Sequence, residues 1–389
     1  MEILLFDQNT GGHHAEYAGR LLNSLSEFGI DADILASKDS RVSDFVMDSD
    51  IIWAKGESEQ NLRQLFDTAF ERKYDAVHIL YLDDIIETID SLKNPNIHSI
   101  PVIATLNGSF FNHFFLNEVN ASVLHYGPSL SSAVPRGVGF STALKEYYLQ
   151  RIVREGKINN ILVHSYEGKK YIEKFINSDL ISPIPDPVKV IDHNISRKEA
   201  RELIGVDEEG IQLLFFGELR KNKGVKFLLK SLRAYEGPRF RLLIAGSPAD
   251  VERAELESLI NSIHLPVVER LKYIEESQIP YYFLASDGVL IPYKQEFGSR
   301  RTSGVFQKAC GYGRPVIASD FGVIGRQTKQ YDAGPTFEPG STPDLNKTIA
   351  DFVKNENQMY DQQSLEEFGR EHSFEQLSET LSKIYRTVR

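Results

Sequence analysis

Two stretches of this chain begin in the same way, with an apolar strand, a glycine-containing loop and an amphipathic helix. In the first, residues 2–6 are followed by the loop QNTGGHH (8–14) and a helical pattern. In the second, residues 212–216 are followed by GELRKNKG (217–224) and another helical pattern. A strand, a glycine loop and a helix in this order open a doubly wound α/β domain. The chain is therefore expected to contain two such domains.

Further apolar segments alternate with helical patterns in both halves. They lie at 32–35, 51–53, 76–79 and 102–106, and again at 240–245, 267–271, 289–292 and 316–318. This alternation predicts an α/β fold with a parallel sheet in each half. Three prolines within SPIPDPV (182–188) indicate a stiff linker and a domain boundary.

Composition narrows the class of protein. The net charge of −11 over 389 residues argues against general nucleic-acid binding. Cys310 is the single cysteine, so no intrachain disulfide can form. Residues 1–6 resemble a buried strand more than a signal peptide, and no apolar run approaches the roughly 20 residues of a membrane span. We therefore expect a cytoplasmic protein with at most peripheral membrane contact.

Three loops have the composition of a phosphate site. They are Thr10–Gly12, Arg220–Gly224 and Arg300–Val305. Each has a simpler reading, a tight turn for the first and a solvated basic loop for the other two. The second and third follow strands of the same predicted sheet, so they should converge on one crevice at its carboxyl edge. Arginine there is suited to bidentate phosphate contact.

The third loop belongs to the stretch Glu296–Gly325. Thr302 and Ser303 are good N-cap residues, and Gly304 lets a ligand approach the backbone where the next helix begins. The free N–H groups and partial positive charge of a helix N-terminus suit a phosphate.

Together, these motifs resemble those of the family 4 retaining glycosyltransferases, which have the GT-B fold of two Rossmann-like domains facing across a cleft. The resemblance rests on pieces in the family's order: GGHHAEY, Val163–Ser165, Pro185–Val188, FFGELRKNKGVKFLLKSL, LLIAGSP and SGVFQKACGYGRPVIASDFG. It implies an acceptor-side domain over 1–184, a nucleotide-sugar-binding domain over 190–363, and a C-terminal helix over 364–389 that returns to the first domain.

The resemblance also assigns roles to residues. Lys223 would neutralise the donor diphosphate, residues 302–305 would present N–H groups to the distal phosphate and sugar, and residues 271–273 would hold the base. The implied substrate-binding residues are Gly11, Gly12, His13, Arg220, Leu271, Tyr273, Arg301, Thr302, Ser303, Gly304 and Val305. No metal and no cofactor are expected, since the nucleoside-diphosphate sugar is itself the donor substrate.

Several positions depart from the family pattern. Glu218 stands where the family has an arginine, and Arg220 or Arg300 is expected to supply that charge. Gly298 and Phe306 stand where the family has two glutamates, and Glu296 is expected to replace the first.

Asn107 occupies the place of a histidine near the transferred sugar. The catalytic candidates are therefore Asn107, Lys223, Glu296 and Arg300. His13 and His14 either reach the cleft or face solvent, and residues 110–115 either meet a lipid acceptor or pack in the core.

The expected function is transfer of a sugar from a nucleoside-diphosphate donor to a hydroxyl of a glycan or lipid-linked acceptor, with retention and without a metal. The missing acids leave two alternatives open. One is a non-catalytic subunit of a glycosylation complex, and the other is a nucleotide-sugar epimerase or hydrolase of the same fold.

Overall fold

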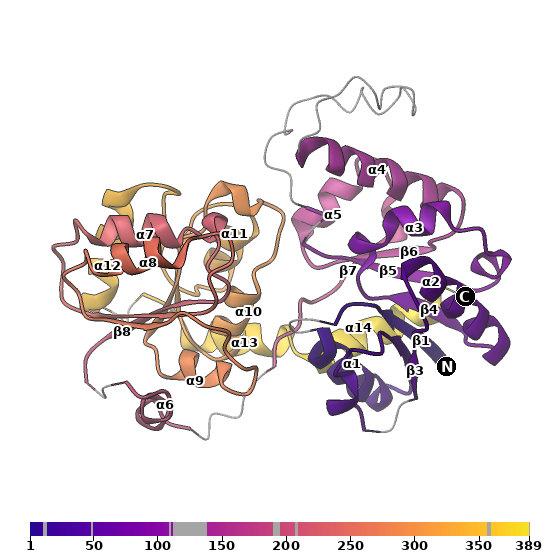
Figure 1. Cartoon of the computed structure of the whole chain (residues 1–389), viewed down its shortest axis with the longest axis horizontal. Helices are drawn as coiled ribbons and strands as arrows, with labels where there is room; N and C mark the ends of the chain where they lie inside the picture. Colours follow the sequence, from indigo (N-terminus) through magenta and orange to yellow (C-terminus); the bar gives the residue numbers. More distant parts are fainter. Residues whose placement is uncertain are drawn as a thin grey trace. The chain divides into compact units, whose positions relative to one another are not determined.

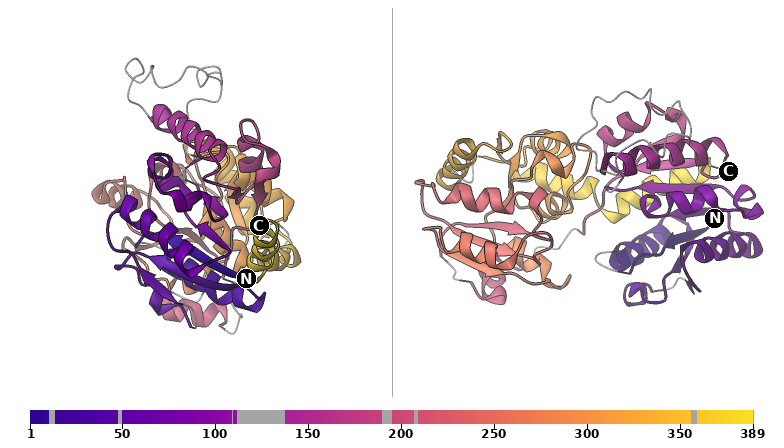
Figure 2. Two further views of the ribbon diagram at one scale, coloured as in Figure 1. Left: turned by 90° about the vertical axis from the view of Figure 1, so that its right-hand side faces the viewer. Right: turned by 45° about the horizontal axis from the view of Figure 1, so that its top comes forward.

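The computed structural model describes residues 1–10, 14–47, 50–108, 110–111, 138–189, 195–206, 209–355 and 359–388, with 138–143 as backbone only. The chain forms two compact units. Unit 1 comprises Met1–Asp186 and Phe374–Arg389, and unit 2 comprises Pro187–Ser373. In each unit, helices cover both faces of one parallel sheet (Figures 1 and 2). The predicted α/β fold class is confirmed.

The sheet of unit 1 has seven strands in the order β3-β2-β1-β4-β5-β6-β7. Their bounds are β1 Glu2–Asp7, β2 Asp31–Ala36, β3 Ile51–Trp53, β4 Ala76–Ile79, β5 Val102–Leu106, β6 Asn160–Val163 and β7 Ile181–Pro183. All neighbouring strands pair in parallel. Successive side chains of a strand point to opposite faces. Accordingly, Leu4 and Phe6 enter one core, whereas Ile3 and Leu5 enter the other.

Two groups of helices cover the faces of this sheet. The helices are α1 His14–Glu27, α2 Ser58–Arg72, α3 Ile86–Ser91, α4 Val138–Arg154, α5 Tyr166–Ile172 and α14 Phe374–Thr387. Side chains of α1 and α14 fill one core, and those of α2 to α5 fill the other. Phe110 and Phe111 are buried in the second core, which favours the packing interpretation for them. Residues 112–115 of the same run lie outside the described residues.

The sheet of unit 2 has six strands in the order β10-β9-β8-β11-β12-β13. Their bounds are β8 Gln212–Phe216, β9 Arg241–Ala245, β10 Val267–Arg270, β11 Gly288–Ile291, β12 Val316–Ser319 and β13 Thr336–Phe337. The helices are α6 Arg197–Ile204, α7 Val225–Leu232, α8 Arg253–Ile260, α9 Ile279–Leu284, α10 Gly304–Gly311, α11 Gly322–Gln330, α12 Thr342–Asn355 and α13 Gln362–Glu371. Helices α7, α8 and α12 pack on one face, and α9, α10, α11 and α13 on the other.

The C-terminal segment differs from the expected single returning helix over 364–389. It forms two helices, of which α13 belongs to unit 2 and only α14 to unit 1. The reason is a core contact: the ring of Phe368 in α13 lies 5.6 Å from that of Phe306 in α10, and both are fully buried. Burying these aromatic surfaces holds α13 on unit 2.

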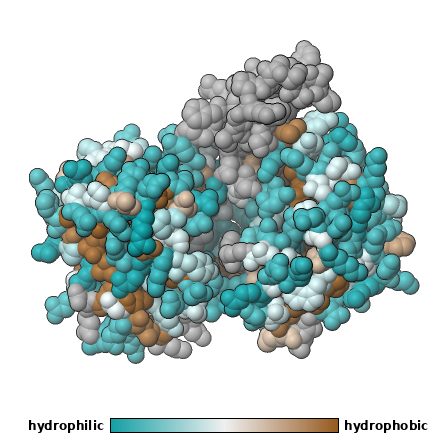
Figure 3. Space-filling model, viewed as in Figure 1, coloured by the Kyte–Doolittle hydropathy of each residue, from teal (hydrophilic) through white to brown (hydrophobic). Residues whose placement is uncertain are grey.

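The two units bury most of their large apolar side chains. On the face shown in Figure 3, hydrophilic residues cover most of the surface, with hydrophobic residues in smaller patches between them. In the described part of the chain, no helix has both the length and the apolar character that crossing a membrane requires.

Helix α14 is fixed to the sheet of unit 1 by a buried polar chain. The His78 ring joins the Tyr385 hydroxyl through Nδ1 at 2.6 Å and the Thr105 hydroxyl through Nε2 at 2.8 Å. Burial, with a smaller contribution from His164, lowers the pKa of His78 to about 3. The imidazole is therefore neutral at physiological pH and needs both partners.

We predict that Tyr385→Phe lowers the free energy of unfolding of unit 1 by about 1–3 kcal/mol, because a buried ring nitrogen of His78 loses its partner. Trp53 is the only tryptophan and lies in β3, so its fluorescence during urea unfolding reports on unit 1. Tyr166→Phe is the matched control, since Tyr166 is 63% exposed. Equal unfolding midpoints for the two variants would contradict this account of α14.

Candidate functional site

The order of strands fixes where a ligand can bind in unit 2. From β8 the chain builds β9 and β10 on one side, and then returns to the other side of β8 with β11. The connections therefore diverge at the carboxyl ends of β8 and β11, and in open α/β sheets ligands bind at such a switch point. Two loops meet there, Gly217–Gly224 after β8 and Pro292–Ser303 after β11.

Glycines let these loops pack closely. A Cβ on Gly224 (φ +75°) would lie 1.9 Å from the carbonyl oxygen of Pro292. A Cβ on Gly246, at the end of β9, would lie 2.0 Å from the carbonyl oxygen of Gly217. Both distances are far below van der Waals contact, so only glycine permits this packing. The backbone of the second loop is also tied to the first by a hydrogen bond of 2.9 Å from Lys294 N to Asn222 O.

Lys223 lies at the centre of this arrangement. A Cβ built on Gly217 would lie 3.1 Å from Nζ of Lys223 and 3.4 Å from Cγ2 of Val305. Among the residues that the structure describes, none accepts a hydrogen bond from the ammonium or pairs with it. An ammonium without a partner in a partly buried position is costly to the folded protein unless an anion joins it.

The electrostatics of Lys223 agree with this geometry. Burial lowers its pKa to about 8; Glu218 opposes the shift, while Arg220, Arg301 and Lys308 add to it. Glu218 is already paired with Arg220, at 2.6 Å from Oε2 to Nη2. Both of those side chains are about half exposed, so their pairing is weak. The site thus carries a surplus of positive charge.

The N-terminus of α10 adjoins this charge. Ser303 is buried, and its hydroxyl accepts a hydrogen bond of 3.3 Å from Phe306 N, as expected of an N-cap. Gly304 is exposed, and a Cβ built on it meets no atom within 4 Å. Packing therefore does not require glycine at this position. Val305, next in the helix, faces Gly217.

The charged residues of the second loop lie in different environments. The guanidinium of Arg301 lies 4.6 Å from the ring centre of Phe297 and contributes to the positive potential at Lys223. Arg300 is partly buried in the turn that follows Gly298. Glu296 is exposed in the short 3-10 helix Gln295–Phe297, and no interaction recorded for the described residues links it to Lys223.

The two positions without the family's glutamates have structural roles. Gly298 adopts φ +104°, a conformation in which a glutamate would be strained. Phe306 is fully buried against Phe368, where a carboxylate would be desolvated. The acids are therefore replaced by residues that the fold of unit 2 uses.

The residues assigned to the base follow β10. Leu271 is buried, and its carbonyl oxygen accepts a long hydrogen bond of 3.4 Å from Arg253. Tyr273 is 56% exposed, so its ring is accessible for stacking. Only the backbone of Leu271 could reach a ligand, whereas Tyr273 could contribute its side chain.

Unit 1 has a switch point of its own, between β1 and β4. Asp7 ends β1, and its Oδ2 lies 3.0 Å from Nδ1 of His14, the first residue of α1. The ring of His14 lies 4.0 Å from that of Tyr81, which follows β4. Gly11, Gly12 and His13 lie outside the described residues. The sequence analysis did not select Asp7, although an acid at the end of β1 before a histidine at a helix start was a usable signal.

Asn107 follows β5 and is bound into its own loop. Its Nδ2 donates to Leu80 O at 2.9 Å, and its backbone N donates to Asp83 Oδ1 at 2.7 Å. The other oxygen of Asp83 accepts from Phe110 N at 2.7 Å. The amide of Asn107 therefore joins the ends of β4 and β5, and Asp83, which sequence reasoning missed, organises the loop.

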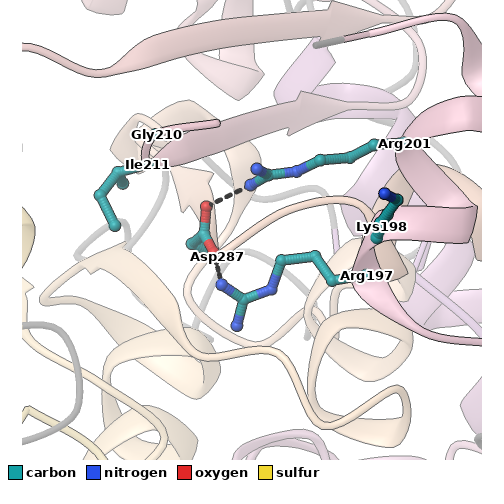
Figure 4. Close-up of a pocket in the computed structure, with 6 residues that line it drawn as sticks. All are labelled: Arg197, Lys198, Arg201, Gly210, Ile211 and Asp287. Atoms are coloured by element: carbon teal, nitrogen blue, oxygen red, sulfur yellow. Dashed lines mark hydrogen bonds and ion pairs between the residues drawn. The ribbon is translucent and has the colours of Figure 1, made fainter. Parts of the chain in front are cut away.

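A separate hollow of about 550 Å³ lies near α6 (Figure 4). Arg197 and Arg201 both point at Asp287, which is fully buried and lies 2.7 Å from Arg201 Nη2. Gln212 N also donates to Asp287 at 2.6 Å. These residues precede β11 and begin β8, at the amino edge of the sheet. We therefore assign them a structural role, holding α6 on the sheet.

Within the described residues, no three His, Cys, Asp or Glu side chains gather as a metal site would require. The positive charges and the helix N-terminus at the unit 2 switch point can instead bind a strongly charged anion.

Comparison with known proteins finds similarities in both sequence and fold. Residues 196–372 match the family described as "Glycosyl transferases group 1". The chain is 34% identical over 107 residues to a GDP-mannose:glycolipid 4-beta-D-mannosyltransferase of Xanthomonas campestris pv. campestris. That match covers 28% of this chain and only 30% of the relative's length.

Solved structures resemble the whole chain. Sucrose-phosphate synthase (tll1590) from Thermosynechococcus elongatus superimposes with a TM-score of 0.67 at 16% identity, covering 100% of this chain and 99% of the other. Anabaena Alr3699/HepE in complex with UDP-glucose superimposes with a TM-score of 0.70 at 14% identity, covering 100% of both chains. The chain thus has the GT-B architecture, and the family match over unit 2 supports a glycosyltransferase.

Proposed function

We propose that this protein transfers a sugar from a nucleoside-diphosphate sugar to a hydroxyl of a glycolipid or glycan. The observation that carries the proposal is the Lys223 ammonium, which has no partner among the described residues and lies among Arg220, Arg301 and Lys308 beside the N-terminus of α10. A departing diphosphate would supply the missing anion. Stabilising that leaving group electrostatically lowers the barrier to transfer.

The chain would need no metal for this step. In the proposal, Lys223 and the arginines neutralise the diphosphate, and N–H groups of residues 302–305 contact its distal phosphate. Arg300 and Glu296 stay as candidates at the margin of the site. Activity that survives EDTA supports this part of the proposal, and loss restored by a divalent cation opposes it.

The relative with 34% identity suggests the first substrates to test. We propose GDP-mannose as donor and a glycolipid as acceptor, with the protein working in the cytoplasm at the membrane surface. Retention, which the resemblance implies, stays a prediction at this point, because the residues of unit 2 hold only the leaving group. Tyr273 is the candidate for stacking on the base.

A donor panel separates this proposal from its alternatives. The purified chain is incubated with GDP-mannose and UDP-glucose, with and without glycolipid, and both nucleotide binding and nucleoside-diphosphate release are measured. Release that requires the acceptor supports transfer. Release without it favours an epimerase or hydrolase, and absence of any binding favours a non-catalytic subunit.

We predict that Lys223→Met weakens GDP binding at least tenfold in calorimetry, because a charge-assisted contact is lost. The same variant should unfold at a higher temperature, since a partly buried cation with no partner among the described residues has been removed. Lys221→Met is the matched control, because Lys221 lies in the same loop with an exposed side chain. Unchanged GDP affinity in Lys223→Met would contradict the assignment.

Two opposite pH trends should follow from the lowered pKa of Lys223. Above about pH 8 the free protein loses the ammonium, so GDP affinity should fall as the pH rises toward 10. The folded-state pKa lies below the ordinary 10.5 of lysine, so the folded state binds fewer protons in this window. The Lys223 contribution to stability therefore rises with pH between about 8 and 10.5. Subtracting the same curves for Lys223→Met isolates both trends, and flat difference curves would refute the prediction.

Gly304 gives a third test of the donor site. We predict that Gly304→Ala leaves the fold intact or stabilises it by up to about 1 kcal/mol, because the added methyl meets no protein atom and alanine favours the helix. The same methyl would occupy the space that a phosphate needs, so donor affinity should fall at least tenfold. Thermal unfolding and calorimetric titration with GDP measure the two effects. An undiminished affinity would show that no phosphate approaches Gly304.

A further inference from the structure

Helix α10 leaves one narrow stripe of its surface accessible. Six of its eight residues are buried, and the two that are not are Gly304 and Lys308. Residues four apart in a helix lie on the same side, one turn from each other. The accessible surface of α10 therefore consists of its N-terminal backbone and one ammonium side chain.

This stripe lies next to the loop that carries Lys223. Because successive residues of an α-helix are rotated by about 100°, the direction of Lys308 falls between those of Gly304 and Val305. Val305 faces Gly217, where a Cβ would also lie 3.1 Å from Nζ of Lys223. Long side chains of a helix lean toward its N-terminus. The Lys308 ammonium is therefore directed back toward Gly304 and toward Lys223.

Charge supports this placement of Lys308. Its ammonium is one of the cations that lower the pKa of Lys223. Among the described residues, none pairs with Lys308 or with Lys223, and Glu218, the acid that acts on Lys223, is already paired with Arg220 at 2.6 Å. Two neighbouring ammonium groups without an acid partner repel each other and favour a ligand that carries two negative charges.

We propose that Lys308 binds the distal phosphate of the donor and, together with Lys223, holds the diphosphate between two ammonium groups. This inference rests on the proposed function and adds a residue that sequence reasoning did not select. A nucleoside-diphosphate sugar carries one negative charge on each phosphate, so the two lysines match its charge. Lys308 takes the distal phosphate because its stripe begins at the N–H groups that the proposed function assigns to that phosphate.

The distal phosphate is also where charge develops during transfer. The bond between the anomeric carbon and the distal phosphate oxygen breaks, and its electron pair stays on that oxygen. The acceptor hydroxyl oxygen bonds to the carbon and releases its proton to water. The distal phosphate thereby gains a second negative charge, so the Lys308 ammonium stabilises the transition state more strongly than the bound donor.

The test compares nucleotides with and without a distal phosphate. GDP and GMP, with UDP and UMP in parallel, are titrated calorimetrically into the full-length protein. Lys308→Met should weaken binding of the diphosphates at least tenfold, because a charge-assisted contact is lost, and leave the monophosphates within about twofold of wild type. Lys308→Arg, which keeps the charge, should recover most of the affinity.

A matched control and two further measurements separate binding from structure. Lys347→Met should bind as wild type, since Lys347 is exposed on α12, on the opposite face of the same sheet. Thermal unfolding verifies that each variant is folded. In transfer assays with GDP-mannose, Lys308→Met should lower kcat by roughly tenfold or more. In ¹⁵N-lysine NMR of the free protein, the same variant should raise the pKa of Lys223, because a neighbouring cation has been removed.

The outcomes distinguish this inference from the proposed function. If Lys308→Met binds GDP as wild type, weakens GDP and GMP equally, keeps the wild-type kcat or leaves the pKa of Lys223 unchanged, the inference is overturned. The proposed function then still stands, provided that Lys223→Met weakens GDP binding. A wild-type protein that binds neither GDP nor UDP overturns the proposed function, and the inference with it.

Discussion

The ammonium of Lys223, which has no partner among the described residues, is the constraint on which the functional account depends. Folding places this group among two arginines and a second lysine, next to Gly217, where a Cβ would lie 3.1 Å from its nitrogen. Such an arrangement lowers stability, and proteins keep it where a ligand compensates. The close packing at Gly217, Gly224 and Gly246 brings the ends of β8, β9 and β11 together, and Gly217 also lies next to Val305 of α10.

Polar groups with a structural role lie at the amino edge of a sheet or deep in a core. The polar groups to which we assign a function lie at a carboxyl edge. At the amino edge of the second sheet, Asp287 pairs with Arg197 and Arg201 and accepts a hydrogen bond from a backbone amide. Within unit 1, His78 has partners on both nitrogens and is neutral. At the carboxyl edge of the second sheet, by contrast, Lys223 has no partner among the described residues. Chemistry in this chain is expected where hydrogen bonding is left incomplete.

Much of the fold could be predicted from the sequence, because strand, glycine loop and helix leave periodic patterns. Lys223, Ser303 and Val305 could be selected for the same reason: they stand at fixed places in a strand–loop–helix motif. Pairings between distant residues leave no such pattern. The contact of Phe306 with Phe368, which keeps α13 on unit 2, and the use of the Asn107 amide by Leu80 depend on tertiary packing. The positions of Asp7 and His14, at a strand end and a helix start, were a usable signal, but the direction of the His14 ring cannot be read from the sequence.

The most direct test of the central claim is the pKa of Lys223, measured by NMR on protein with ¹⁵N-labelled lysine, with Lys223→Met used to assign the signal. The account predicts a pKa near 8 in the free protein. Saturating GDP should raise it by at least one unit, because the diphosphate stabilises the ammonium. A pKa near the ordinary 10.5 of lysine that does not respond to GDP would contradict the account.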